Sequence, residues 1–150
     1  MAVQWYRKSA EQADPTAEND LGIMYSLGEG IARSKEEAVK WYARAAKHGN
    51  SQAMFNVGAS YYNGDGVDQD DVQAYVWFLL GQDAGNTTAD AAAKRSATTL
   101  SGETADAYQR ISEMYEKGDE LPKDDAQVLR WLKKRQTEVP RRKSSSQCAT

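Results

Sequence analysis

The sequence has few of the residues on which most enzyme sites, metal sites and membrane anchors depend. It holds one cysteine, Cys148, and one histidine, His48. A lone cysteine excludes an internal disulfide, and these two residues together cannot supply the four ligands of a structural zinc site. No apolar run approaches the roughly 20 residues that span a bilayer, and the first residues lack the apolar centre of a secretory signal. We therefore expect a cytoplasmic chain as written, or a periplasmic or secreted one if an upstream signal peptide has been removed.

Net charge is also small, because the 150 residues carry a formal charge of only −3. Such a balance gives no general attraction for nucleic acid. The charge is uneven, however: residues 130–150 hold seven Lys and Arg against one acidic residue, so this end carries +6 and the rest −9. No aromatic residue interleaves its basic side chains Lys133, Lys134, Arg135, Arg141, Arg142 and Lys143. We interpret them as a solvated helix end and tail, with a tether to nucleic acid or to an anionic membrane as the alternative.

What the sequence does have is a repeat of 36 residues. Residues 21–53 recur as residues 57–89, and the shared positions are Gly22/Gly58, Tyr25/Tyr61, Gly28/Gly64, Gly30/Gly66, Ala38/Ala74, Trp41/Trp77, Gly49/Gly85 and Ala53/Ala89. Trp5, Ala10 and Ala17 lie one period before Trp41, Ala46 and Ala53 and so fit the same repeat. A further copy, 90 positions on and therefore out of phase, consists of Ile111, Tyr115, Gly118, Leu121 and Trp131. A fixed period in this range is typical of stacked repeat architectures.

Each repeat reads as two helices joined by a tight turn. In the first repeat, apolar residues from Ala17 to Tyr25 follow helical spacing, and Gly28 can close the helix in the left-handed conformation. Ser34 is placed to cap the next helix, as Asp70 is in the second repeat. No segment alternates apolar and polar residues over the length of a strand. The sequence therefore predicts an all-α fold of seven or eight short helices in antiparallel hairpins.

The repeats divide the chain into a solenoid, residues 1–139, and a disordered basic tail, residues 140–150. Within the solenoid we expect an incomplete N-terminal repeat, two full repeats, an irregular insertion and a final degenerate repeat, at residues 2–16, 17–52, 53–88, 89–106 and 107–139. The incomplete repeat matches only the second half of a full one. Either a longer protein continues upstream, which we favour, or this first helix is a cap. Its Trp5 and Tyr6 lack a preceding helix and leave room for self-association.

The pattern resembles the Sel-1-like repeat family of bacterial type, a relative of the tetratricopeptide repeat. The resemblance is carried by Leu21-Gly22, Tyr25, Gly28, Gly30-Ile31, Ala38, Trp41-Tyr42, Ala45-Ala46, Gly49 and Ala53. It implies a right-handed α-α superhelix and a role as a non-enzymatic adaptor or scaffold for a protein or peptide partner. Lys94 and Ala97 stand where the preceding repeat has Gly58 and Tyr61, so we expect a regular superhelix only up to Gly85.

Enzyme chemistry finds little support, and we predict no catalytic, metal or cofactor residues. His48 stands at a helix C-terminus, where capping or a surface role explains it, and Cys148 lies in a tail without fixed neighbours. The acidic cluster from Asp65 to Asp71 lacks the alternating spacing and distal Glu of a calcium loop. The enzymatic alternative is a hydrolase of the β-lactam-binding type, because a cysteine-rich subset of the family is linked to β-lactam binding. The cysteine pairs of that subset are absent from this sequence, which argues against this alternative.

The resemblance places the working surface on the concave side of the superhelix. The first helix of each pair would line this groove, and the residues off its packing face are Asn19, Ile23, Ser26, Phe55, Ala59 and Tyr62. Phe55 and Tyr62 are seven residues apart and share one helix face, whereas Tyr61 points into the hairpin. Exposed aromatic residues are typical binding anchors; the alternative is that both rings only pack against the next hairpin. The predicted function is therefore binding of a peptide or partner segment in the groove.

Overall fold

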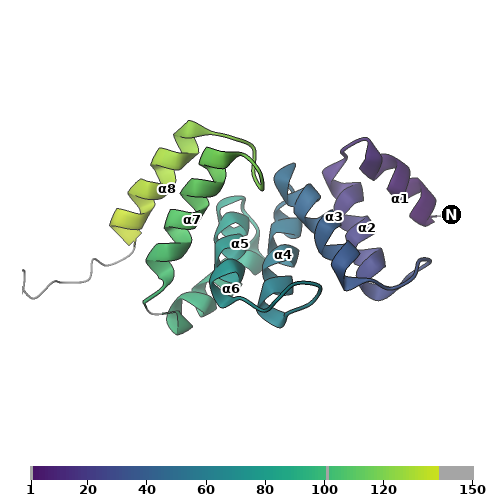
Figure 1. Ribbon diagram of the computed structural model, residues 1–150, viewed down its shortest axis with the longest axis horizontal. Helices are drawn as coiled ribbons and strands as arrows, with labels where there is room; N and C mark the ends of the chain where they lie inside the picture. Colours follow the sequence, from purple (N-terminus) through teal and green to yellow (C-terminus); the bar gives the residue numbers. More distant parts are fainter. Residues whose placement is uncertain (1, 101, 139–150) are drawn as a thin grey trace, which may run out of the picture.

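The computed structural model describes residues 2–100 and 102–138, and every regular element in these ranges is an α-helix (Figure 1). The eight helices are α1 (Ala2–Glu11), α2 (Pro15–Leu27), α3 (Lys35–Lys47), α4 (Ser51–Asn63), α5 (Asp71–Asp83), α6 (Thr87–Thr99), α7 (Thr104–Lys117) and α8 (Asp125–Glu138). Each helix from α1 to α5 packs on the next one along the chain, and α7 packs on α8. The predicted all-α fold is confirmed. The predicted tail, residues 140–150, lies outside the described residues.

The same backbone hydrogen bond closes three of the hairpins. In each, the N–H of the residue before the second helix donates to the carbonyl of a tyrosine near the end of the first: Ser34 to Tyr25 at 2.9 Å, Asp70 to Tyr61 at 2.9 Å and Asp124 to Tyr115 at 3.1 Å. The first helix of each hairpin ends at a glycine in the left-handed conformation, namely Gly28, Gly64 or Gly118. A residue without Cβ adopts this conformation at little cost. The recurring tyrosines and glycines therefore specify one turn geometry, which the chain uses three times.

Side-chain caps recur with the same period. The side chains of Asp14, Asn50 and Asn86 accept backbone N–H donors at the starts of α2, α4 and α6. Ser34 and Asp70 cap α3 and α5, as predicted. Such caps satisfy N–H groups that have no partner inside the helix. The sequence therefore sets the helix starts in both halves of the two full repeats.

Two glycines allow the paired helices of a repeat to touch. Gly22 of α2 faces Tyr42 of α3, and Gly58 of α4 faces Phe78 of α5. A Cβ atom at either glycine would lie 2.6 Å from two carbon atoms of the facing ring. Carbon atoms normally pack at about 3.5–4.0 Å. The recurrence of glycine at this position therefore has a packing cause, because the ring of the second helix lies directly on the backbone of the first.

Helix α5 forms the centre of the core. Its residues 73–81 are all buried, and it packs on α4, α6 and α7. The regular order of hairpins changes here, because α6 and α7 both lie against α5 (Figure 1). Helices α7 and α8 then form the last hairpin, in which the ring centroids of Tyr108 and Trp131 lie 5.7 Å apart. Helix α6 begins and ends 36 residues after α4, so the period continues through α6 and is lost after it, where the final hairpin follows in place of a second helix.

None of the helices in the described ranges is both long enough and apolar enough to cross a membrane.

Candidate functional site

A pocket of about 520 Å³ lies between α4, α5 and α6. Three of the predicted residues line it, Phe55, Ala59 and Tyr62, together with Phe78 of α5. The ring centroids of Phe55 and Phe78 lie 5.7 Å apart with their planes tilted by 30°, which is a favourable aromatic contact. The side chain of Tyr62 is exposed, at 57% of its full accessible surface. The pocket therefore combines a partly buried aromatic floor with an exposed ring.

The neighbouring tyrosines of α4 have different surroundings. Tyr61 is partly buried and packs against the core, whereas Tyr62 is exposed and lines the pocket. One step along a helix turns the side chain by about 100°, so the two rings cannot share a face. The ring that Phe55 contacts, Phe78, belongs to the same hairpin. Phe55 thus joins the core on one side and lines an open pocket on the other.

A second pocket, of about 170 Å³, continues the groove toward α2. Ser26 lines it, and Ala59 and Asn63 line both pockets. The Lys35 ammonium donates a hydrogen bond to Ser26 Oγ at 3.0 Å. Burial raises the pKa of the Tyr42 hydroxyl in this pocket, and a hydrogen bond with Ser26 partly offsets the rise. Ser26 and the three residues of α4 therefore lie along one groove that runs across α2, α4 and α6.

The remaining two predicted residues lie elsewhere. Asn19 is only 5% exposed, and its Oδ1 accepts a hydrogen bond from Asn56 Nδ2 at 2.9 Å. It therefore joins α2 to α4 below the surface, which corrects its predicted place on the open groove. Ile23 is partly buried, packs against the core and lines neither pocket. Helical spacing identifies a face of α2, but it does not show that Asn56 of the next repeat bonds to Asn19 on that face.

The predicted site residues do not include the wall that α6 contributes to the first pocket. This wall consists of Ala92, Arg95, Ser96, Thr98 and Thr99. Helix α6 falls largely in the predicted irregular insertion, but its bounds lie 36 residues after those of α4, so Arg95 and Thr98 correspond to Ala59 and Tyr62. A second signal is the helical spacing of Ala89, Ala92, Ala93 and Ser96, which are buried and so orient the helix. Arg95 lies beside this buried stripe and is exposed.

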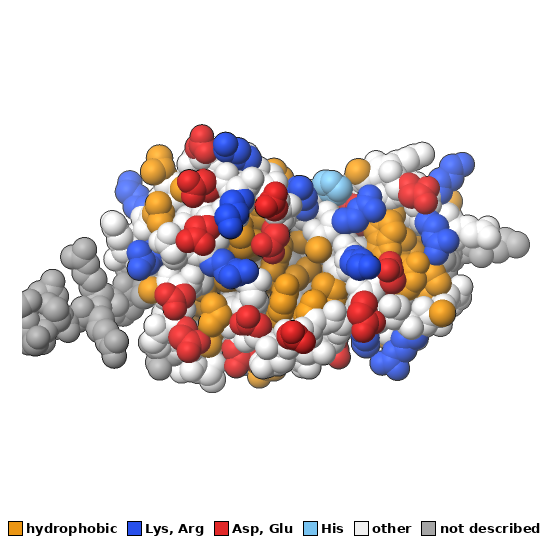
Figure 2. Space-filling view, viewed as in Figure 1, with side chains coloured by type: hydrophobic (Ala, Val, Ile, Leu, Met, Phe, Trp, Pro, Cys, Tyr) orange, Lys and Arg blue, Asp and Glu red, His pale blue; other side chains and the backbone are white. Residues whose placement is uncertain are grey.

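On the face shown in Figure 2, hydrophobic side chains gather over the middle of the molecule. Lys, Arg, Asp and Glu side chains surround them on this face. Contiguous apolar surface with a polar rim is typical of interaction sites. The surface of the central helices is therefore less polar than its surroundings in this view.

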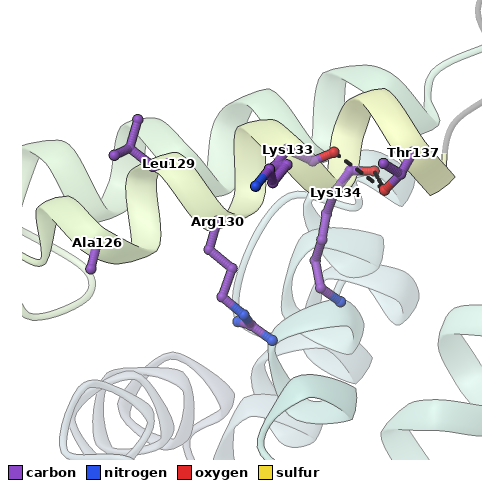
Figure 3. Close-up of a pocket in the computed structure, with 6 residues that line it drawn as sticks. All are labelled: Ala126, Leu129, Arg130, Lys133, Lys134 and Thr137. Carbon is purple, nitrogen blue, oxygen red and sulfur yellow. Dashed lines mark hydrogen bonds between the residues drawn. The ribbon is translucent and has the colours of Figure 1, made fainter.

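Helix α8 exposes a different face at the other end of the chain (Figure 3). Leu129 is 71% exposed and lines an open pocket of about 640 Å³ with Lys133 and other residues of α8. Arg130 forms a bidentate pair with Asp83 of α5, and the Lys134 ammonium lies 5.1 Å from the centroid of the Trp131 ring. The side chains of Arg130 and Lys134 extend away from Leu129 (Figure 3). Part of the basic charge that suggested a tether is therefore engaged within the protein, and Arg141, Arg142 and Lys143 lie outside the described residues.

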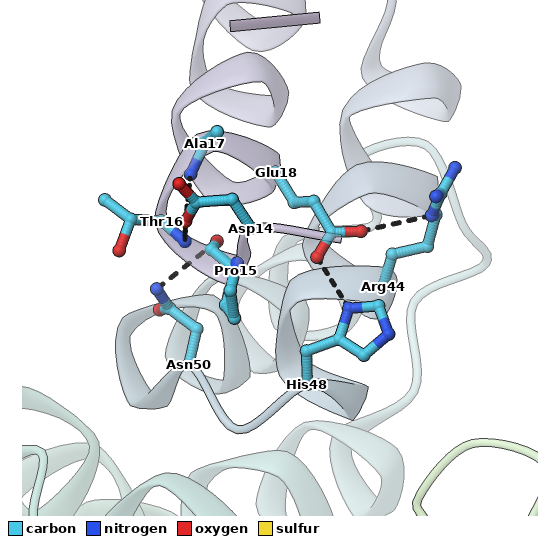
Figure 4. A network of polar contacts seen from close by, with 8 residues as sticks. All are labelled: Asp14, Pro15, Thr16, Ala17, Glu18, Arg44, His48 and Asn50. Carbon is cyan, nitrogen blue, oxygen red and sulfur yellow. Dashed lines mark hydrogen bonds and ion pairs between the residues drawn. The ribbon is translucent and has the colours of Figure 1, made fainter. Parts of the chain in front are cut away.

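A buried carboxylate connects the first two helices of the first full repeat (Figure 4). Glu18 of α2 is fully buried, and its Oε1 lies 2.7 Å from Nδ1 of His48. Its Oε2 lies 3.2 Å from Nε of Arg44 in an ion pair that lacks hydrogen-bond geometry. His48 is the C-cap residue of α3, as predicted, and additionally contacts this carboxylate. The cluster gives a structural explanation for the histidine, and nothing in the sequence pattern marks Glu18 as buried.

The acidic cluster has local explanations in the structure. Asp70 caps α5 by accepting a hydrogen bond from the N–H of Gln73 at 3.0 Å, and Asp71 accepts one from the Gln69 side chain. Among the described residues, no group of three or more His, Cys, Asp and Glu side chains could hold a metal ion.

Comparison with known proteins agrees with the repeat pattern. The Sel1 repeat matches residues 1–14, 15–50, 51–86 and 105–134, which leaves α6 outside the matched repeats. No curated protein matches the chain.

Two solved structures are similar over most of the chain. One is a Sel1 repeat protein from Oxalobacter formigenes, with 28% identity, a TM-score of 0.60, and coverage of 91% of this chain and 63% of that chain. The other is a protective antigen present in uropathogenic Escherichia coli strains that displays an SLR fold. It has 28% identity, a TM-score of 0.58, and coverage of 91% of this chain and 33% of that chain. The present chain thus spans less than two thirds of either protein.

Proposed function

Because the chain belongs to the Sel1 repeat family, we propose that it is a non-enzymatic scaffold that binds an extended segment of a protein partner. The binding surface in this proposal is the groove that runs across α2, α4 and α6. Members of the family generally serve as protein–protein interaction modules. Binding of a partner segment in this groove is our proposal for this chain.

One observation carries the proposal: Phe55, Ala59 and Tyr62 line one pocket on α4. Tyr62 exposes a large ring, and an aromatic side chain beside a pocket gains much buried area on binding at little cost in conformational entropy. Ala59 lies between the two rings along α4 and lines both pockets. Its small side chain leaves the passage between the pockets open. These features suit a segment that inserts side chains into successive hollows.

Capture of partners from an extract of the source cells tests the proposal. We would compare the wild-type protein with Ala59→Arg, which fills the passage, and with Tyr62→Ala, which removes the exposed ring. Neither change removes a buried core side chain. The matched control is Leu129→Ala, which removes an exposed apolar side chain from a different pocket, on α8; Leu129 is 71% exposed and Tyr62 is 57% exposed. Far-UV circular dichroism establishes that all variants are folded.

The proposal predicts a protein that the wild type and Leu129→Ala retain and that both groove variants lose. If all four proteins retain the same partner, or if only Leu129→Ala loses it, the binding surface lies not in the groove but on α8 or another face.

A further inference from the structure

The pocket between α4, α5 and α6 has a distinct chemical character. Its floor is aromatic, with Phe55, Phe78 and Tyr62, and α6 adds three hydroxyl side chains, Ser96, Thr98 and Thr99. Among the described residues that line this pocket, Arg95 alone carries a charge. The pocket therefore presents an apolar surface together with one positive charge.

The guanidinium of Arg95 is not paired with any carboxylate in the described part of the chain. Arg95 is exposed and forms no ion pair with another described residue. The adjacent residue, Lys94, differs in both respects that matter: its ammonium lies 3.0 Å from Asp90 Oδ2, and it does not line the pocket. An arginine that is not already paired can bind a carboxylate through two parallel hydrogen bonds. Arg95 is therefore available to a bound partner, whereas Lys94 is engaged within α6.

The smaller pocket has no such preference for one sign of charge. It is lined by Lys35 and by Asp65, and the Lys35 ammonium is already a donor to Ser26. Ala59 and Asn63 line both pockets, so a bound segment can continue from one to the other. A side chain within such a segment can supply a negative charge at the α6 end. A free chain end is not required.

We infer that the partner segment carries an aspartate or glutamate close to an apolar residue, with the carboxylate paired to Arg95 and the apolar side chain against Phe55 and Tyr62. This inference rests on the proposed function of the groove. Successive residues of an extended segment are about 3.3 Å apart. The acidic and apolar residues should therefore be separated by no more than about three positions, which keeps both within one pocket.

Selection from a random peptide library tests this inference. The peptides are displayed through fusion of their C-termini, so enrichment of acidic residues reports side chains and not a terminal carboxylate. We would carry out parallel selections with the wild type, with Arg95→Glu and with the matched control Lys94→Glu. The wild type and Lys94→Glu should enrich Asp or Glu near an aromatic or aliphatic residue. Arg95→Glu should lose this preference and enrich Lys or Arg at that position.

Affinities of the selected peptides, synthesised with amidated C-termini, provide a second measurement. Arg95→Gln should weaken binding by roughly two- to fivefold, as expected for an exposed charge pair. Lys94→Gln should leave the affinity unchanged. Peptides that depend on Tyr62 and Ala59 but show no acidic preference would overturn the inference while leaving the proposed function in place. If no selected peptide depends on Tyr62 or Ala59, the proposed function itself fails.

Discussion

Replacing Gly58 with alanine tests the packing that positions the groove, because Gly58 precedes Ala59 on α4. The added Cβ would lie 2.6 Å from Cδ1 and Cε1 of Phe78 and 3.1 Å from the carbonyl oxygen of Ala74. Since carbon atoms pack at about 3.5–4.0 Å, the ring must move by about 1 Å. Phe78 has little room to do so, because it is 4% exposed and contacts Phe55.

The size of the effect follows from two opposing terms. Overpacking a core costs about 1–3 kcal/mol, and the higher helix propensity of alanine offsets about 0.5–1 kcal/mol of this. We therefore expect Gly58→Ala to lower the free energy of unfolding by about 1–2 kcal/mol. For a chain of this length, the corresponding fall in Tm is roughly 2–8 °C.

Urea unfolding followed by far-UV circular dichroism measures this loss. Gly102→Ala is the matched control, because its Cβ would meet nothing within 4 Å, and we expect no loss of stability there. In a Phe78→Leu background the penalty of Gly58→Ala should shrink, since leucine does not present a ring to the α4 backbone. An unchanged or increased stability of Gly58→Ala, or the same loss in both backgrounds, would refute the reasoning.

Three further predictions concern charge and backbone conformation. Burial, and then the charge of Asp14, raise the pKa of Asp20 above its ordinary value. The folded state therefore favours the protonated carboxyl, so this group stabilises the fold at low pH and loses that contribution as the pH rises through the raised pKa. Asp20→Asn should therefore raise Tm at about pH 7 and leave it unchanged at about pH 3. An equal change in Tm at both pH values would contradict this assignment. Glu18→Gln should lower the free energy of unfolding by about 1–2 kcal/mol, since it removes a buried carboxylate charge that pairs with Arg44 and contacts His48, both of which retain access to water. A neutral result in urea unfolding would show that the cluster adds no net stability. Gly66→Ala should lower the free energy of unfolding by about 2–4 kcal/mol, and Gly49→Ala by only about 1–2 kcal/mol. Both glycines have positive φ, but of the two only Gly66 would place a Cβ against a neighbouring backbone, that of Lys35 at the start of α3. Equal losses of stability would argue against that contact.

The sequence period predicts the architecture because the recurring residues are those that touch within one hairpin. Gly58 and Phe78 are separated by only 20 positions, so both fall inside one copy of the repeat. The same holds for Tyr61 and Asp70, which share the backbone hydrogen bond that closes the turn. Where the defining contacts are local, the pattern of residues contains enough information to predict helix type, turn position and pairing.

Contacts between repeats, and contacts of polar residues, are harder to predict. Asn19 and Asn56 are 37 residues apart, and Glu18 and His48 are 30 apart. Whether a polar side chain on an apparently open face is buried depends on which neighbouring helix covers it, and spacing within one helix carries no information about that. Arg95 lies 36 positions after Ala59 and so occupies the corresponding groove position on α6. Lys94 and Ala97 replace Gly58 and Tyr61 on this helix, however, and these replacements hide the register.

Site-specific photo-crosslinking tests whether a partner protein binds in the groove. A benzophenone amino acid would replace Tyr62 in the groove and, in a separate protein, the similarly exposed Leu129 on α8. In extracts of the source cells, we expect the probe at position 62 to crosslink to a partner protein and Ala59→Arg to abolish this product. We expect the probe at position 129 not to form the product. A partner that crosslinks at position 129 and not at position 62 would show that the groove is not the binding surface.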